Sequence, residues 1–267
     1  MNDPFSTIAE AFSRTGEKYD AFAQDHPNLT RMRNKVYAHL ERYLPGGGRI
    51  LELNAGTGID AVELARRGYS VHATDIAPGM LERARDKAHH LGLEDRISTQ
   101  ECSFTRLDEI QGAPYDAVFS NLGGLNCIPD LAPAIRQLPG VLKPGGLVTW
   151  VLMPPVCLWE IAELVRGHPK LAFRRLAKNG THTHLEGLYF TIYYFKPLQV
   201  VEWFGPDYEI LAVEGLSVFT PTAESKNFPR RYPKLYQFLV WLDDRFTHRP
   251  PWHGWGDFYI LSMRLRS

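Results

Sequence analysis

One stretch of the chain constrains the fold more than any other: residues 49–75, RILELNAGTGIDAVELARRGYSVHATD. It begins with a short apolar run at residues 50–53, breaks at Asn54-Ala55-Gly56-Thr57-Gly58, and continues as an amphipathic run from Ile59. These parts predict a buried parallel strand, a glycine turn and a helix. A second apolar run ends at Asp75, so its carboxylate is expected at the tip of the next strand, where βαβ units hold a ribose. The stretch therefore predicts a nucleoside-binding half-site, with glycines that let a ligand approach the backbone.

The glycine spacing alone leaves the nucleoside open. Gly56-x-Gly58-x-x-Ala61 also fits the fingerprint of nicotinamide dinucleotide enzymes. Glu52 discriminates between the two, because an acid inside the first strand would repel a pyrophosphate and attract an ammonium group. A cationic ligand without phosphate therefore fits better. A nicotinamide-dependent oxidoreductase stays open as an alternative, and so does a binding module without turnover.

At these residues the sequence resembles the class I S-adenosylmethionine-dependent methyltransferases of the small-molecule type. The first motif of that family is an acid, three residues and Gly-x-Gly, and a second acid ends the next strand; Glu52, Gly56, Gly58 and Asp75 stand in those places. The run at residues 115–126, YDAVFSNLGGLN, and the Lys-Pro-Gly-Gly sequence at 143–146 are similar to the family as well. The resemblance covers roughly residues 1–153 and the last strand.

The resemblance implies S-adenosylmethionine as the cofactor, together with the residues that bind it. Tyr19 and Arg33 are candidates to touch its methionine end, and Ile76 and Met80 to wall the adenine. Where the family commonly has an acid at the tip of the third strand, this chain has Cys102-Ser103-Phe104, so a backbone carbonyl or the Ser103 hydroxyl is expected to substitute. The expected cofactor-binding residues are Tyr19, Arg33, Glu52, Asn54, Gly56, Thr57, Gly58, Asp75, Ile76, Met80, Cys102, Ser103, Phe104, Asn121, Leu122 and Gly123.

The length and composition suit one α/β domain with insertions. A chain of 267 residues, of which 44% are hydrophobic, can bury a full core. The resemblance implies a Rossmann-like methyltransferase fold: a mostly parallel sheet of about seven strands, an antiparallel last strand, and helices on both faces. We expect an N-terminal helical cap over 1–46 and a methyltransferase domain over 47–267, with insertions at 154–196 and 220–256. Both insertions are expected to project over the ligand side, the first as a lid.

Local patterns predict the remaining elements. The expected helices cover about residues 4–22 with a break at Gly16, 29–44, 78–90, 129–142, 156–166, 197–204 and 233–245. The expected strands cover 96–101, 115–121, 147–153, 209–219 and 257–265, with a hairpin around Gly187 at 181–194.

The net charge of the chain is zero, which excludes a strong electrostatic field around the whole protein. Thirty basic and thirty acidic side chains cancel, and the amino-methylating Asn/Asp-Pro-Pro-Tyr motif is absent, so we expect a small-molecule acceptor and neither nucleic acid nor a membrane as partner. Three widely spaced cysteines and an N-terminus without a signal pattern favour the cytoplasm, and the oligomeric state stays open. A run of basic residues in the second insertion indicates a solvated helix face, or a surface for an anionic group of the substrate or of a partner: Lys226, Arg230, Arg231, Lys234, Arg245 and Arg249.

Methyl transfer needs an aligned acceptor and, for a hydroxyl acceptor, a base. His182 and His184 share one face of a predicted strand, and His253 lies in a Trp- and Gly-rich loop. These three are the candidate catalytic residues, with Glu186 beside them, although two solvated strand-face histidines are the more ordinary interpretation of His182 and His184. Two histidines could ligate a metal, but no third ligand is apparent in the sequence, so no metal site is expected.

Overall fold

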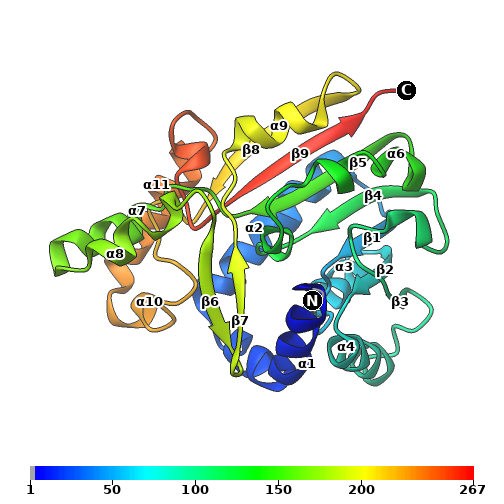
Figure 1. Cartoon of the computed structure of the whole chain (residues 1–267), viewed down its shortest axis with the longest axis horizontal. Coiled ribbons are helices and arrows are strands. Elements are labelled where there is room, and N and C mark those ends of the chain that lie inside the picture. Colours follow the sequence, from blue (N-terminus) through cyan, green and yellow to red (C-terminus); the bar gives the residue numbers. More distant parts are fainter. Residues whose placement is uncertain (1–3) are drawn as a thin grey trace.

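The computed structural model describes residues 4–267, and its centre is a seven-stranded sheet (Figure 1). The strands lie in the order β3-β2-β1-β4-β5-β9-β8. Strands β1 to β5 run parallel, whereas β9 runs antiparallel to both of its neighbours, β5 and β8. The predicted mostly parallel sheet with an antiparallel last strand is confirmed. The strand bounds are β1 Gly48–Leu53, β2 Tyr69–Asp75, β3 Ile97–Glu101, β4 Tyr115–Ser120, β5 Leu142–Leu152, β8 Tyr208–Leu216 and β9 Phe258–Leu265.

The strand order reverses at β1, and this reversal places the site. β1 pairs with β2 on one side and with β4 on the other, through Ile50↔Val71 and Ile50↔Ala117. In an open parallel sheet such a reversal leaves a crevice at the carboxyl ends of the strands, because the connections on the two sides leave in opposite directions. Leu53, Asp75 and Ser120 end the three strands at this crevice.

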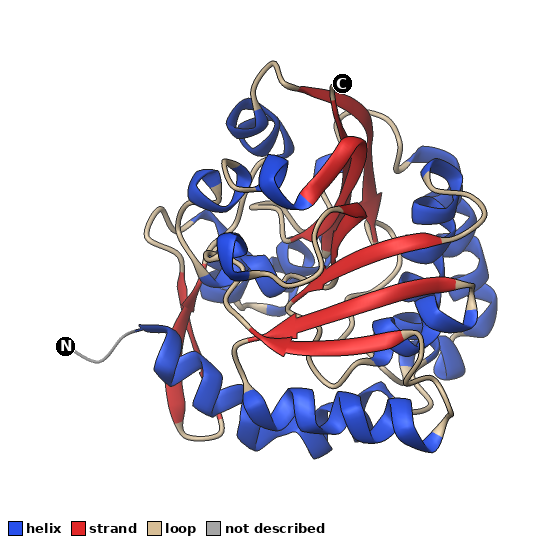
Figure 2. Ribbon diagram, turned by 90° about the vertical axis from the view of Figure 1, so that its right-hand side faces the viewer, coloured by secondary structure: helices blue, strands red, loops and turns tan. Residues whose placement is uncertain are grey.

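Helices cover both faces of the sheet, as Figure 2 shows. Successive strand residues bury opposite sides: Leu51, Val118 and Trp150 belong to one hydrophobic cluster, and Ile50 and Phe119 to the other. The helices are α1 Pro4–Ala23, α2 Pro27–Tyr43, α3 Ile59–Arg66, α4 Pro78–His90, α5 Ala132–Ile135, α6 Leu138–Val141, α7 Leu158–Ile161, α8 Pro169–Ala172, α9 Pro197–Phe204, α10 Phe228–Arg231 and α11 Pro233–Phe246. Short 3-10 helices are η1 Leu107–Glu109, η2 Gly124–Cys127, η3 Ala162–Arg166, η4 Arg174–Leu176 and η5 Trp252–Gly254.

Several element boundaries differ from the prediction. Helix α1 continues through Gly16, where a Cβ would lie only 2.7 Å from Cδ of Arg83, so this glycine gives room to an arginine of α4 and does not break the helix. The helix predicted over 129–142 is wrong. Two single turns, α5 and α6, take its place, because Pro139 has no amide hydrogen to continue the ladder. The helix predicted over 156–166 is a short α7 followed by the 3-10 helix η3.

The two insertions pack against different helices of the N-terminal segment. The predicted hairpin is confirmed as a two-stranded sheet of β6 Thr181–Leu185 and β7 Leu188–Ile192, which packs against α1. The second insertion, with α10 and α11, packs against α2, where Arg31 pairs with Asp243 and Asp244 of α11. None of the helices in residues 4–267 has both the length and the apolar character that crossing a bilayer requires.

Candidate functional site

A pocket of about 200 Å³ opens at the carboxyl ends of the central strands, beneath α1 and the hairpin. Most of its wall is apolar, and its polar groups lie on the strand side. The lining residues are Ile8, Phe12, Tyr19, Asn54, Gly56, Asp75, Ile76, Met80, Phe104, Asn121, Leu122, Gly123, Gly124, Cys127, Met153, Phe190 and Ile192.

Three residues of the glycine turn after β1 have a left-handed backbone conformation, and their surroundings differ. Asn54, Gly56 and Gly58 have φ values of 57°, 56° and 75°. A Cβ on Gly56 would meet nothing within 4 Å, so this residue leaves open space beside the pocket. A Cβ on Gly58 would lie 2.8 Å from Cβ of Ala84, so this glycine lets α3 and α4 approach. The predicted pair of glycines thus divides into one that faces the pocket and one that packs.

Asp75 stands at the end of β2 and organises the pocket floor. One of its carboxylate oxygens accepts the amide hydrogen of Gly56 at 2.9 Å, and the other accepts that of Ala77 at 2.9 Å. Burial raises the pKa of Asp75, while these backbone hydrogen bonds act to lower it. Each oxygen keeps a second lone pair, so the side chain can accept two further hydrogen bonds, as a ribose diol would supply.

Glu52 lies in a buried charged cluster behind the glycine turn. The cluster joins Arg33 of α2 to Asp60 of α3 at 2.5 Å, and Arg33 also donates to the hydroxyl of Tyr19 at 3.0 Å. Oε2 of Glu52 and Nε of Arg33 are buried and have no hydrogen-bond partner. Burial raises the pKa of Glu52 well above its usual value, the charge of Asp60 adds to this, and Arg33 opposes it. An orphaned buried acid and an orphaned guanidinium nitrogen, side by side, fit the ammonium and carboxylate of an amino-acid ligand.

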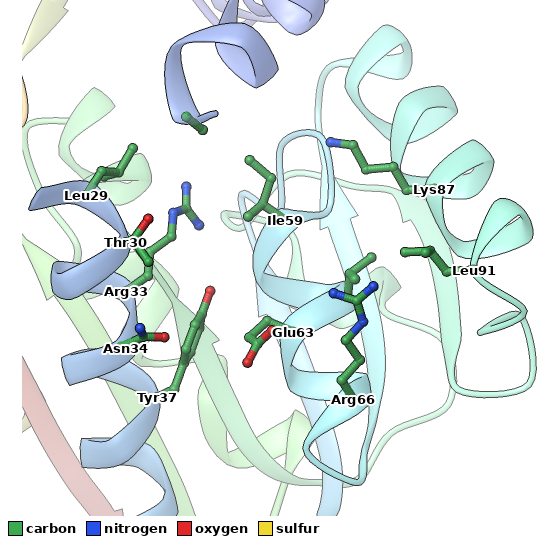
Figure 3. A pocket seen from close by; sticks show the side chains of 12 residues that line it. Leu29, Thr30, Arg33, Asn34, Tyr37, Ile59, Glu63, Arg66, Lys87 and Leu91 are labelled. Atoms are coloured by element: carbon green, nitrogen blue, oxygen red, sulfur yellow. The ribbon is translucent and has the colours of Figure 1, made fainter. Parts of the chain in front are cut away.

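Figure 3 shows the outer side of this cluster, a cleft of about 290 Å³ between α2, α3 and α4. Arg33 and Tyr37 reach into it from α2, Glu63 and Arg66 from α3, and Lys87 from α4. Arg33 is common to this cleft and, through Tyr19, to the pocket at the strand ends, so it lies between the two cavities.

Helix α1 is tied to the glycine turn through Asp20. Its carboxylate accepts from Oγ1 of Thr57 at 2.6 Å and from Nζ of Lys87 at 2.6 Å. Thr57 therefore attaches α1 to the turn; like Glu52 and Arg33, it does not line the pocket, and its contact with the cofactor stays a prediction. The neighbouring Tyr19, held by Arg33, does line the pocket.

The tip of β3 differs from the prediction. Phe104 lines the pocket next to Ile76 and Met80, but Cys102 and Ser103 do not. The Cys102 amide donates to the Asp75 carbonyl, and the Ser103 hydroxyl bonds to that of Thr105, so both residues hold the loop in place. After β4, the predicted residues Asn121, Leu122 and Gly123 do line the pocket.

The predicted catalytic histidines lie away from the pocket. In the hairpin, His182 is opposite Thr191 and His184 is opposite Tyr189, on an exposed face. The other face, which carries Phe190 and Ile192, lines the pocket. Glu186 sits at the hairpin tip, where it pairs with Lys18, and His253 is also outside the pocket lining. The prediction that His182, His184 or His253 acts as the base is therefore not supported by their positions, because a strand pairing fixes which face each side chain takes.

Sequence reasoning missed two groups of site residues. Ile8 and Phe12 form the α1 wall, and their spacing of four along an amphipathic helix was a usable signal. Asp60, the hub of the charged cluster, also accepts hydrogen bonds from Tyr37 and Asn121. In the sequence, Asp60 is an ordinary acid in the first turn of a helix, and nothing there indicates that it would bind Arg33, Tyr37 and Asn121.

A second buried cluster holds three potential metal ligands. Ligand atoms of Cys157, Glu160 and Asp257 lie within 4.8 Å of one another. Arg175 donates to Glu160 at 2.8 Å and to Asp257 at 2.8 Å, so a guanidinium group already supplies the positive charge that a cation would bring. This cluster is structural.

Comparisons with known proteins agree with this geometry. A family model described as a methyltransferase domain matches residues 50–146. The tRNA 5-carboxymethoxyuridine methyltransferase of Escherichia coli (strain K12) is 24% identical over 97% of this chain and 95% of its own length. The malonyl-[acyl-carrier protein] O-methyltransferase of Halorhodospira halophila (strain DSM 244 / SL1) is 29% identical over 73% of this chain and 68% of its own length.

Solved structures share the fold at low sequence identity. The CcbJ methyltransferase from Streptomyces caelestis superposes with a TM-score of 0.62 at 17% identity, covering 95% of this chain and 96% of that one. The DhpI–SAH complex has a TM-score of 0.59 at 16% identity and covers 100% and 98%. On the acid-flanked glycine turn, the strand order and these matches, the chain belongs to the class I S-adenosylmethionine-dependent methyltransferases.

Proposed function

We propose that this enzyme methylates a small, largely apolar organic acceptor enclosed beneath α1 and the β6–β7 hairpin. The observation that carries the proposal is the pocket wall: Ile8 and Phe12 from α1 face Phe190 and Ile192 from the hairpin across an apolar chamber. Phe12 and Phe190 contact each other with ring centroids 5.8 Å apart, so the chamber is closed on that side. An enclosed apolar chamber suits a small ligand better than a flipped base on a long polymer.

The strand side of the pocket would hold the cofactor. Asp75 has free lone pairs for the ribose hydroxyls, and Ile76, Met80 and Phe104 offer apolar contact to the adenine. Glu52, with Arg33 and Tyr19, would receive the amino-acid end, where Oε2 of Glu52 and Nε of Arg33 lack a hydrogen-bond partner. The open space beside Gly56 would let the cofactor come close to the backbone of the glycine turn. When bound, the cofactor supplies an electrophilic methyl carbon with its positive charge already in place.

The chain's own contribution is positioning, not proton abstraction. Among the pocket-lining residues the titratable groups are Tyr19, Asp75 and Cys127. Burial raises the pKa of Tyr19 above its usual value, and burial raises that of Cys127 to about 12, so both stay protonated at neutral pH. Asp75 is engaged by two backbone amides. We infer that the acceptor arrives with its nucleophilic atom ready, and that alignment against the methyl group provides the acceleration.

The relatives act on acceptors of different classes. The names of three relatives give these acceptors as a tRNA 5-carboxymethoxyuridine, malonyl-[acyl-carrier protein] and demethylmenaquinone. The enclosing wall favours a free small molecule for this chain. The acceptor test uses S-adenosylmethionine with a tritiated methyl group and an extract divided into small molecules, protein and RNA; label is expected in the small-molecule fraction, and label in RNA alone would contradict the proposal.

The cofactor site is tested by Asp75→Ala. Loss of the carboxylate should weaken binding of S-adenosylhomocysteine about 10- to 100-fold, or roughly 1–3 kcal/mol, because the ligand hydroxyls lose their acceptor. Titration calorimetry measures the change. Asp116→Ala is the matched control, since Asp116 lies near the start of β4, at the opposite end of the strands from the pocket, and pairs with Lys143. Unchanged affinity in Asp75→Ala, or tight binding of NADH by the unaltered enzyme, would sink the assignment.

A further inference from the structure

The outer face of α11 carries large apolar side chains in contact with solvent. Leu235, Phe238 and Trp241 are 49%, 54% and 55% exposed, and Tyr232 just before the helix is 44% exposed. Their spacing of three residues places Leu235, Phe238 and Trp241 along one side of the helix, and the rings of Phe238 and Trp241 stack 6.0 Å apart. An exposed apolar group of this size is a recognised mark of an interaction site.

Hydrogen bonds on the inner face of α11 determine which side of the helix is exposed. Asp243 is buried and accepts hydrogen bonds from the amides of Val218 and Phe219. Tyr236 donates from its hydroxyl to Asn28 of α2 at 2.9 Å. These contacts hold one side of the helix against the protein, and the side with Phe238 and Trp241 has to face outward.

The same outer face carries unpaired positive charge. Lys234 and Arg245 are eleven residues apart, which is about three helical turns, so they lie on the side of Phe238. Both are exposed, and neither has an ion pair or a hydrogen bond among the described residues. Asp244, the exposed acid of the helix, is occupied by Arg31 and Lys35. We call this set of Tyr232, Lys234, Leu235, Phe238, Trp241 and Arg245 the α11 surface.

A second segment with the same chemistry lies at the same end of the molecule. In Figure 1, α8 and α10 lie together at the end opposite the C-terminus. Trp159 of α7 contacts Phe228 of α10 with ring centroids 5.3 Å apart, so the two insertions meet there. The α8 segment exposes Leu171, Phe173 and Leu176, flanked by the exposed Lys170 and Lys178. Apolar side chains bordered by cations therefore recur in both insertions.

We propose that the α11 surface docks on an anionic phospholipid membrane, with the helix lying in the interface and its aromatic side chains inserted among the acyl chains. A helix that combines a polar inner anchorage with exposed Trp, Phe and Leu beside Lys and Arg has the composition of interfacial membrane helices. The cations would meet the lipid phosphates, and the apolar groups would leave water. The chain's zero net charge does not oppose this, because the attraction acts locally within a Debye length.

The chemistry of the surface favours lipid over two other occupants. A second copy of this chain would bring Lys234 and Arg245 of both copies to a common isologous interface, where like charges repel. RNA would use cations and flat aromatic rings, but it gains little from aliphatic side chains such as Leu235, Leu171 and Leu176. Acyl chains accept both kinds of side chain. The inference does not depend on which acceptor the enzyme methylates.

Vesicle flotation with the full chain tests the proposal. Vesicles of phosphatidylcholine with about a third phosphatidylglycerol should carry the protein to the top of a gradient, vesicles of phosphatidylcholine alone should carry much less, and about 0.5 M salt should weaken the binding. The double variant Phe238→Ser/Trp241→Ser should lower the apparent affinity at least about tenfold. Lys234→Glu/Arg245→Glu, which reverses two exposed charges and leaves the apolar side chains in place, should abolish the preference for anionic vesicles.

Leu198→Ser is the matched control, because Leu198 is 70% exposed on α9 outside this surface, and its binding should stay within about twofold of the unaltered protein. Affinity for S-adenosylhomocysteine shows that each variant is folded. The proposal is overturned if the unaltered protein does not float with anionic vesicles or if both double variants bind like it. It is also overturned if sedimentation shows a dimer that Trp241→Ser dissociates, or if tRNA binds more tightly than the vesicles and competes for the same side chains.

Discussion

The molecule contains two buried clusters in which an arginine meets carboxylates, and they differ in how completely the polar atoms are paired. Arg175, in the first insertion, uses Nε and both terminal nitrogens on Glu160, Asp257 and the Asp257 carbonyl, all at 2.8 Å. Arg33, behind the glycine turn, leaves Nε without a partner, and Glu52 beside it leaves Oε2 without one. Both arginines are almost fully buried.

The difference in pairing is matched by opposite pKa shifts of the two glutamates. Burial on its own raises the pKa of Glu160, but the hydrogen bonds from Arg174 and Arg175 outweigh it and the pKa is lowered. Burial also raises the pKa of Glu52, and there the nearby acids keep it well above its usual value. An unsatisfied buried acid in a folded protein calls for an explanation, and the proposed function supplies one: the amino-acid end of the cofactor would complete Glu52.

The largest expected effect is on the saturated cluster. Arg175→Met would leave Asp257 and much of Glu160 as buried charges without their main partner, and it should cost about 3–5 kcal/mol of unfolding free energy. Urea denaturation measures this. Arg174→Met is the matched control, because Arg174 pairs with the same Glu160 but its side chain is 32% exposed, and its cost should be about 1 kcal/mol. Equal costs for the two variants would contradict the structural role given to Arg175.

The opposite outcome is expected for the unsatisfied cluster. Glu52→Gln should weaken S-adenosylhomocysteine binding by about 2 kcal/mol, because a charged hydrogen bond to the ligand is lost, and should leave stability at neutral pH unchanged or improved. The pKa of Glu52 is raised in the folded state, so its contribution to stability is complete below about 4.5 and is lost as the pH rises. The unaltered enzyme should therefore lose thermal stability relative to Glu52→Gln between about pH 5 and pH 8.

Glu101→Gln, at the exposed end of β3, serves as the control for Glu52. If Glu52→Gln unfolds more readily at pH 8 than the unaltered enzyme, the acid is a stabilising structural group and the contrast between the clusters fails.

The fold could be predicted from the sequence where local sequence patterns agree with the tertiary packing of the element. Strand β2, helix α4 and helix α9 were predicted to within a residue or two, because Pro78 and Pro197 mark helix starts and the apolar runs are short and bounded. The segment at 129–142 failed because periodicity took no account of Pro139 inside it. The packing of the second insertion on α2 rests on contacts more than 200 residues apart in sequence, such as Arg31 with Asp244, which no local pattern contains.

The candidate site divides in the same way. Asp75, Gly56 and Asn121 could be placed because a motif ties each of them to a strand end. The histidines at 182 and 184 could not, since alternation along a strand tells which residues share a face and not which face meets the pocket. Asp60 looked like an ordinary first-turn acid, and its role came from Arg33, Tyr37 and Asn121 converging on it from separate elements.

Glu214, a partly buried acid, extends the comparison to a smaller effect. Burial alone raises the pKa of Glu214, but the hydrogen bond from His39 and the charge of Lys35 outweigh it and lower the pKa to about 2. Its contribution to stability is therefore present above about 4.5 and is lost as the pH falls toward 2. Glu214→Gln should cost about 1–3 kcal/mol at pH 7, and this cost should shrink on acidification. Glu209→Gln, exposed on the same strand, is the control in urea titrations at pH 7 and pH 3; a cost that stays constant with pH would rule out the ion pair as its source.

The smallest effect is expected from an ion pair that joins α1 to the hairpin, the two elements over the pocket. Lys18 of α1 donates to both oxygens of Glu186 at the hairpin tip, at 2.7 and 2.8 Å, yet the two side chains are 71% and 26% exposed. An exposed pair of this kind contributes about 0.2–1 kcal/mol, so Lys18→Ala should leave the unfolding free energy almost unchanged. The pair also ties α1 to the hairpin, whose residues line the pocket, so in Lys18→Ala the dissociation rate of S-adenosylhomocysteine should rise about two- to fivefold in stopped flow at low salt. At high salt the rate of the unaltered enzyme should rise to that of the variant, because screening weakens the pair. Arg14→Ala removes an exposed pair within α1 and should not change that rate. A rate that changes equally in both variants would show that α1 loosens as a whole, and the Lys18–Glu186 pair would then have no part in closing the pocket.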